Sequence, residues 1–226
     1  MHRGQKGGVM KKPIIILALL GGLVVGPQHA TADDSVKSIL TDMTHVKRWN
    51  RFADKLLELH NNIISGHEIR TTESTGGYFR EPDFYKDVHY YDARSGRLLS
   101  HVQWETKHPD RVHFMEVFSY DDKGRVIRDF GVAFLTEGRN APVQTLINFH
   151  TYPEGLHAFR QFDASNNRIF ERCDGKYKGK EVGIKLSEMD ILEVEDLPKS
   201  ILTSPEYKKC FEGLPHSAGK YLTPQM

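Results

Sequence analysis

Between Ser35 and Ser65, apolar residues recur three or four positions apart, with charged residues between them. This spacing predicts an amphipathic helix over residues 33–66, because one helical turn takes 3.6 residues. Gly66 stands where helices commonly end. The continuity of the helix stays open, because Asp42 and Thr44 could each cap a second segment. The predicted apolar stripe consists of Val36, Ile39, Leu40, Met43, Val46, Trp49, Ala53, Leu56, Leu57, Ile63 and Ile64.

After Asp87 the apolar period changes from 3.6 to 2, which indicates β-strands. Residues 67–87 are polar and rich in glycine and threonine, which favours a loop, with one short strand at Ile69–Glu73 as the alternative. Short connections predict an antiparallel meander of about seven strands over residues 88–186. The predicted strands are Val88–Asp92, Arg97–Thr106, Arg111–Asp121, Arg125–Thr136, Val143–Tyr152, Leu156–Asp163 and Arg168–Asp174, with an eighth at Glu181–Leu186 as an option.

Three of the connections begin with an aromatic residue followed by aspartate: Asp92, Asp121 and Asp163. An aspartate at this position can accept hydrogen bonds from the turn backbone, and a later glycine or asparagine tolerates the left-handed conformation. The middle turn resembles the Tyr-Asp-x-x-Gly-Arg hairpin of YD-repeat shell proteins. The resemblance is limited to the turn and implies a hairpin, with no function attached.

The fold class expected is α+β, with the N-terminal helix packed on a curved antiparallel sheet. A half-barrel is the preferred form, and a small closed barrel is the alternative. Residues 33–226 are expected to form one domain. In the segment 187–226, Ser204 and Pro205 predict the start of a short helix.

The first 32 residues have the features of a secretory signal peptide. A basic start precedes an apolar run at 14–26, and Ala30-Thr31-Ala32 is a small-x-small cleavage signature. Export to the periplasm or beyond follows, with no stable membrane anchor. Removing this leader changes the formal net charge from +1 to −3, which disfavours nucleic acid as a partner. Cys173 and Cys210, the only cysteines, are therefore expected to form a disulfide.

Turn geometry fixes the register of a hairpin, so the two faces of the sheet can be derived. We pair Asp92 with Arg97, Thr106 with Arg111, Asp121 with Arg125, Thr136 with Val143, Tyr152 with Gly155 and Asp163 with Arg168. The core face then holds Val88, Tyr90, Leu99, Val112, Phe114, Phe118, Val126, Phe130, Val132, Phe134, Ile147, Phe149, Ala158, Phe162, Ile169 and Cys173. The opposite face mixes aromatic, polar and small residues, which suits either a binding surface or the solvated side of a sheet.

On that second face the derived register places Asp129 opposite His150 and His150 opposite His157. Two imidazoles and a carboxylate on adjacent strands can bind a divalent metal such as zinc or non-haem iron. The alternative is an ordinary cross-strand polar pair on a solvated surface.

A second polar cluster is predicted on the core face, where His101 lies opposite Glu116 and diagonal to Arg128. It could be a functional pocket or a satisfied structural network. Six further histidines are expected at the surface: His45, His60, His67, His89, His108 and His216.

The sequence contains no nucleophile-elbow, zincin, phosphate-loop or dinucleotide-binding motif. We therefore expect a non-catalytic exported module that binds a small molecule or an exported partner protein on the second face. A metal-dependent enzyme and a structural component of an exported assembly are the alternatives. The expected ligand-binding residues are Tyr91, Trp104, Met115, Asn148 and Phe159.

Overall fold

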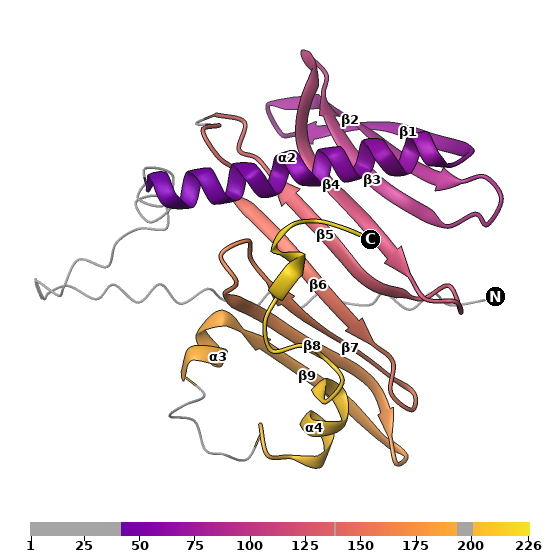
Figure 1. Cartoon of the computed structure of the whole chain (residues 1–226), viewed down its shortest axis with the longest axis vertical. Coiled ribbons are helices and arrows are strands. Elements are labelled where there is room, and N and C mark those ends of the chain that lie inside the picture. The colour runs from indigo at the N-terminus through magenta and orange to yellow at the C-terminus, as the bar shows by residue number, and fades with distance from the viewer. Residues whose placement is uncertain (1–41, 138, 194–200) are drawn as a thin grey trace, which may run out of the picture.

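The computed structural model describes residues 42–137, 139–193 and 201–226. Nine antiparallel strands form one sheet in the order of the sequence, and a long helix, α2 (Met43–Gly66), crosses one face of it (Figure 1). The strands are β1 (Ile69–Tyr78), β2 (Glu81–Asp92), β3 (Leu98–Glu105), β4 (His108–Tyr120), β5 (Val126–Ala133), β6 (Gln144–Thr151), β7 (Leu156–Phe162), β8 (Arg168–Tyr177) and β9 (Lys180–Ser187). The α+β prediction is confirmed in this coarse form.

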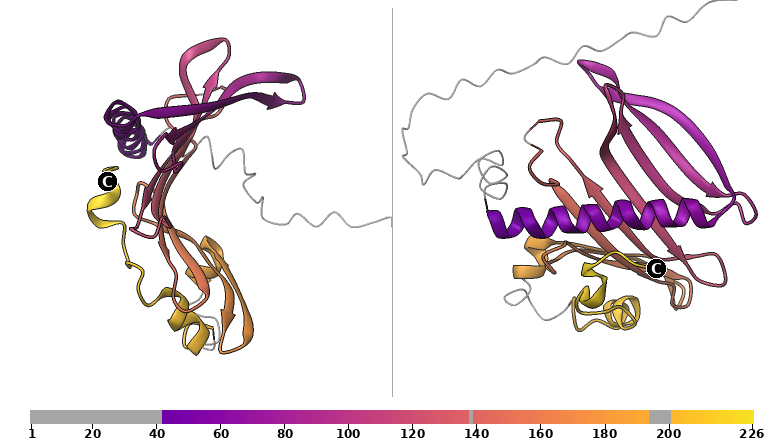
Figure 2. Two further views of the ribbon diagram at one scale, coloured as in Figure 1. Left: turned by 90° about the vertical axis from the view of Figure 1, so that its right-hand side faces the viewer. Right: turned by 45° about the horizontal axis from the view of Figure 1, so that its top comes forward.

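The sheet is curved and open (Figure 2). Its edge strands are β1 and β9, so the closed-barrel alternative is wrong. The strand count is nine rather than seven, partly because the optional eighth strand exists as β9. No helix among the described residues is both long and apolar enough to cross a membrane.

The helix begins at a polar cap and buries one stripe. The Asp42 carboxylate accepts hydrogen bonds from the backbone N–H groups of Thr44 (2.8 Å) and His45 (3.3 Å). The predicted start near residue 33 and the predicted signal peptide lie outside the described residues. The stripe that faces the sheet is Val46, Trp49, Phe52, Ala53, Leu56, His60 and Ile63.

Replacing Asp42 with alanine is expected to lower the free energy of unfolding by about 1 kcal/mol, because two backbone donors lose their acceptor. Urea unfolding followed by circular dichroism measures the change. The exposed Asp54→Ala on the same helix is the control and should change the value by less than about 0.5 kcal/mol. Equal effects of the two substitutions would contradict the capping role.

His60 corrects a prediction, because it is 1% exposed rather than at the surface. Its Nδ1 lies 2.9 Å from the Ser100 hydroxyl, and its ring meets the Tyr90 ring edge-on at 4.8 Å. Burial lowers the pKa of His60 to about 4. A neutral imidazole thus joins the interface between helix and sheet.

The predicted loop at 67–87 is wrong: the alternative strand at Ile69–Glu73 lies within β1, which forms a hairpin with the first half of β2. Nearly every β1 side chain is exposed, so the strand has no apolar alternation to reveal it. Its glycines permit close approach between the strands. A Cβ on Gly77 would lie 2.1 Å from the carbonyl oxygen of Glu81.

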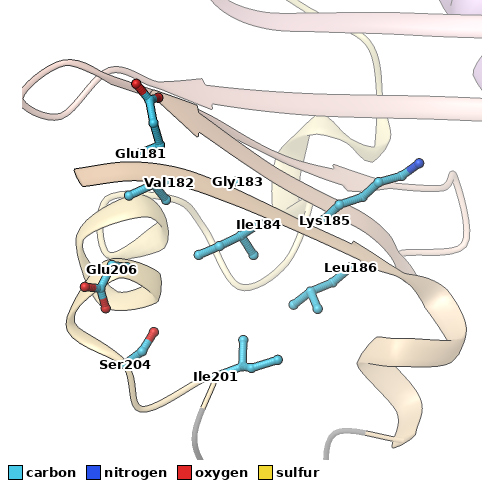
Figure 3. Close-up of a pocket in the computed structure, with 9 residues that line it drawn as sticks. All are labelled: Glu181, Val182, Gly183, Ile184, Lys185, Leu186, Ile201, Ser204 and Glu206. Carbon is cyan, nitrogen blue, oxygen red and sulfur yellow. The ribbon is translucent and has the colours of Figure 1, made fainter. Parts of the chain in front are cut away.

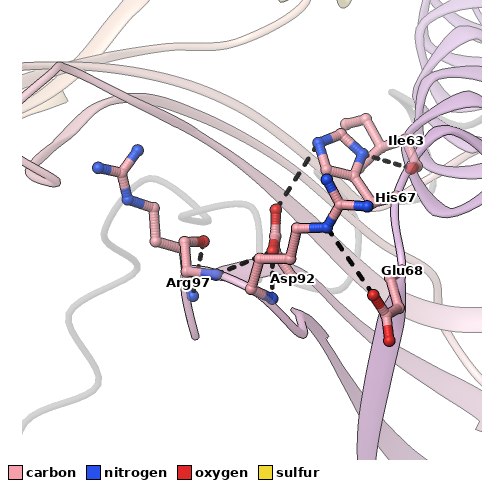
Figure 4. A network of polar contacts seen from close by, with 7 residues as sticks. Ile63, His67, Glu68, Asp92 and Arg97 are labelled. Atoms are coloured by element: carbon pink, nitrogen blue, oxygen red, sulfur yellow. Dashed lines mark hydrogen bonds and ion pairs between the residues drawn. The ribbon is translucent and has the colours of Figure 1, made fainter.

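The three aspartate-led turns form as expected. In the first, the Asp92 carboxylate accepts hydrogen bonds from the backbone N–H groups of Arg94 (2.7 Å) and Ser95 (3.0 Å), and these bonds lower the pKa of Asp92. Figure 4 shows how this turn meets the end of α2, where His67 lies between Asp92 and the Ile63 carbonyl. Asp121 and Asp163 bond their own turns in the same way.

The C-terminal segment covers the same face as α2, alongside β6 to β8 (Figure 1). It contains α3 (Glu188–Glu193), α4 (Pro205–Phe211) and the short 3-10 helix η1 (Gly219–Leu222). Ser204 caps α4 and Pro205 opens it, as predicted. The predicted disulfide is confirmed: Cys210 of α4 is bonded to Cys173 of β8, with a Cα–Cα distance of 6.0 Å. This bond is compatible with an oxidising, exported location.

Two β-bulges change the faces derived from the sequence. Between β2 and β3 the register shifts by one residue at Tyr90/Tyr91, and between β4 and β5 it shifts at Ser119/Tyr120. A one-residue shift turns every side chain of the following strand to the other face. The derived faces of β3 and β4 are therefore inverted, whereas the second bulge restores them from β5 onward.

Candidate functional site

We call the face of the sheet opposite α2 the open face, because no helix or strand of the described residues covers it (Figure 2). Directly paired residues on neighbouring strands share a face. One row across the open face is His89, His101, Glu116 and Gly131, and another is Phe118, Asp129, Asn148, Gln161 and Phe170.

The polar centre of the open face is Asp129 on β5, which is only 4% exposed. Its Oδ1 accepts a hydrogen bond from the Asn148 side-chain amide at 2.5 Å, and its Oδ2 lies 2.6 Å from Nε2 of His150. Asn148 in turn accepts a bond of 2.8 Å from Gln161. On the far side of His150, its Nδ1 lies 3.0 Å from Nε2 of His157.

The structure thus brings together the three residues predicted as metal ligands, although the register differs from the derived one. Asp129 pairs with Asn148 and His150 pairs with Phe159, each two residues away from the expected partner. A shift of two residues keeps the face, so the side chains still meet. The three side chains form a linear series of contacts, which we call the Asp129 row, with His150 between Asp129 and His157. Their ligand atoms do not surround one point.

Glu116 extends this row toward β4. Burial raises the pKa of Glu116 to about 8, helped by the charge of Asp129 and by a hydrogen bond between the two carboxyl groups. At neutral pH Glu116 is therefore mostly protonated and can donate to the Asp129 carboxylate. Gly131, directly opposite Glu116, adds no side chain beside it.

The second predicted cluster is only partly as expected. His101 does pair with Glu116, but both lie on the open face because of the first bulge. Arg128 lies on the helix face instead, with its guanidinium 4.0 Å from the centre of the Tyr221 ring. The sequence placed the Asp129 cluster and the His101 cluster on opposite faces of the sheet. In the structure both clusters lie on the open face, and Arg128 is not part of either.

Aromatic rings flank the polar row. The ring centroid of Phe159 lies 5.4 Å from that of His150 and 5.7 Å from that of Phe170. The Tyr152 ring stacks on the His157 ring with a centroid distance of 4.7 Å. His157 is exposed as a residue, although its ring is partly desolvated. This desolvation is the main cause that lowers the pKa of His157, and the proximity of His150 is the second. The solvent end of the row is therefore an uncharged imidazole at neutral pH.

The five predicted ligand-binding residues do not all reach this face. Tyr91, Asn148 and Phe159 belong to it. Met115, at 1% exposure, and Trp104 instead pack in the core beneath α2, because β3 and β4 are inverted. Phe114 and Phe118 take their place on the open face, and sequence analysis missed them for the same reason.

Hollows lie elsewhere on the molecule, and two of them are next to α4. Figure 3 shows one of about 500 Å³, where Val182, Ile184 and Leu186 of β9 face Ile201 and Ser204. Another of about 410 Å³ is lined by residues that include Arg160, Tyr207 and Phe211. The first has an apolar floor, and the side chains at the base of the second are already paired with one another. We therefore regard the open face as the stronger candidate.

The chain matches no protein-family model, no curated protein and no solved structure.

Proposed function

We propose that this protein is an exported, non-catalytic module that binds a small ligand on the open face of its sheet. The observation that supports the proposal is the Glu116–Asp129 carboxyl pair, which is held among aromatic rings on a face that no described element covers. Groups whose pKa values are strongly perturbed are concentrated at functional sites.

The chemistry of the face favours a ligand with a flat apolar body and a cationic amine. Phe114, Phe118 and Phe159 offer ring surface for the body. An ammonium group near Glu116 would favour loss of the shared proton, because an opposite charge favours the ionised form of a carboxyl group. The expected ligand class is therefore an aromatic amine rather than an aromatic acid.

Isothermal titration calorimetry with phenethylamine and tryptamine, against phenylacetate, tests this class. We expect the amines to bind and the acid not to bind. Asp129→Asn should weaken amine binding at least tenfold, because it removes the negative charge of the pair. The exposed Asp174→Asn is the matched control and should leave binding unchanged. Absence of amine binding, or equal affinity in both variants, would overturn the amine proposal.

One observation favours the enzyme alternative, namely the connection of a buried carboxyl pair to an exposed imidazole. The row from Glu116 through Asp129 and His150 to His157 could move a proton between the interior and solvent. If Asp129, His150 and His157 hold a metal, protein purified from its own host should carry one, and His150→Ala should lose it. Native mass spectrometry measures this, and equal occupancy in the two proteins would contradict the alternative.

A further inference from the structure

A second group of metal-ligand types lies on the open face, at the β2–β3 end. Asp87 and His89 are two residues apart on β2, so their side chains share a face. His101 on β3 is the direct partner of His89 across the strands. One ligand atom from each of these three residues lies within 4.8 Å of the others.

We propose that Asp87, His89 and His101 form a binding site for a divalent transition-metal ion of the zinc class. Two imidazole nitrogens and one carboxylate oxygen suit zinc, and also copper, nickel or cobalt. Calcium and magnesium prefer ligand sets made of oxygen alone. Three protein ligands leave at least one coordination position for water or another molecule.

The ligand atoms of the group lie close together, and the two imidazole rings must turn out of their stack to point at one ion. The rings of His89 and His101 are stacked with centroids 4.2 Å apart and planes 11° apart, and Asp87 Oδ1 contacts Nε2 of His101. Two ligands at tetrahedral positions around zinc lie about 3.3 Å apart, given bonds of roughly 2.0 Å. Rotation of the side chains alone can therefore bring the three atoms to one ion.

The surroundings leave the negative charge of Asp87 available to a cation. Its side chain is 20% exposed and that of His101 is 18% exposed, so the group is accessible without being fully solvated. Lys86, the neighbouring basic residue on β2, forms an ion pair with Glu73 at 2.8 Å instead. Alternation along the strand directs Lys86 to the opposite face from Asp87.

The Asp129 row differs from this group in one respect. Both ring nitrogens of His150 are engaged there, one with Asp129 and the other with His157, on opposite sides of the ring. A metal would have to replace those contacts. In the Asp87 group one ligand atom from each of three residues lies within 4.8 Å of the others, so the two sites make different predictions for the same experiment.

The test is a titration of the full, untagged and chelator-treated protein with Zn²⁺, in competition with a chromophoric chelator. We expect one equivalent to bind, and the His89→Ala/His101→Ala variant to weaken binding at least tenfold. The matched control is His150→Ala/His157→Ala, which removes two histidines from the same face and should keep wild-type affinity. Asp87→Asn, a smaller change, should also weaken binding and serves if the double variant fails to fold.

Three results would overturn the proposal: no Zn²⁺ binding to the wild type, unchanged affinity in the folded Asp87 and His89/His101 variants, or loss of binding only in the His150/His157 control. The last result would assign the metal to the Asp129 row. Binding of an aromatic amine is measured separately and without metal, so failure of one proposal leaves the other standing.

Discussion

Replacing Glu171 with alanine is expected to lower the free energy of unfolding by about 3–5 kcal/mol, because it would leave a buried guanidinium without its counter-ion. Glu171 on β8 is completely buried and Arg160 on β7 is 2% exposed. Nε of Arg160 donates to one carboxylate oxygen of Glu171, and the Tyr207 hydroxyl donates to the other at 2.8 Å. One side chain thus connects two strands and α4.

The effect should extend to the C-terminal segment. Arg160 also donates to the carbonyl oxygens of Leu214 (3.2 Å) and Pro215 (2.9 Å), so its position holds that segment against the sheet. Burial, together with the Glu171 charge, raises the pKa of Tyr207 to about 12, which keeps its hydroxyl protonated as a donor. Faster proteolysis within residues 201–226 should accompany the global loss of stability.

Urea unfolding at neutral pH with the disulfide intact measures the change. Asp174→Ala is the matched control, since it removes an ion pair with Arg172 on the same strand, where both side chains are more than half exposed. Such pairs contribute at most about 1 kcal/mol. A loss for Glu171→Ala no larger than that of the control would show that the buried pair has little influence on stability.

Elements with one buried and one exposed face could be predicted from the sequence. The stripe of Trp49, Ala53 and Leu56 on α2 was found, because half of each turn meets the sheet and half meets water. The turns at Asp92, Asp121 and Asp163 were found because each aspartate accepts hydrogen bonds from backbone N–H groups of its own turn, which depend only on neighbouring residues. Neither case depends on distant parts of the chain.

The β1–β2 hairpin was missed because it extends beyond the core. With both faces of β1 exposed, its polar residues carry no period of two, and threonine and glycine resemble a loop. His60 was misplaced for the converse reason. A histidine within an apolar stripe is judged by its polarity, and only the packed structure supplies Ser100 and Tyr90 around it.

The candidate site was half predicted because of the bulges. From β5 to β7 the faces were right, so Asp129, His150 and His157 were found together. The residues left unpaired by the bulges are Leu99 and Ile127, which are apolar like their neighbours, so the sequence contains no signal for either bulge. For that reason Glu116 was assigned to the wrong face, although it is the partner that gives Asp129 its unusual chemistry.

Glu116→Gln is expected to remove a pH dependence from the stability of the protein. The pKa of Glu116 is raised from 4.5 to about 8 in the folded chain, so between these values the folded state binds a proton that the unfolded state has released. The contribution of Glu116 to stability is therefore complete below pH of about 4.5 and is lost as the pH rises to about 8. The limiting slope is about 1.4 kcal/mol per pH unit.

Glutamine does not titrate, yet its amide can still donate a hydrogen bond to Asp129. The variant should consequently gain stability relative to the wild type as the pH rises from about 5 to about 8, with no further gain above that range. Urea unfolding at several pH values measures the difference. The control is Glu181→Gln on the exposed side of β9, which should give a nearly constant difference across the range.

An infrared spectrum of the folded protein near pH 6.5 separates this explanation from a general electrostatic effect. A protonated carboxyl group has its own C=O stretching band, and we expect one such group in the wild type and in Glu181→Gln, but none in Glu116→Gln. Parallel stability curves for wild type and Glu116→Gln would contradict the shared proton. So would a protonated band that survives in Glu116→Gln, because the proton would then belong to another carboxyl group.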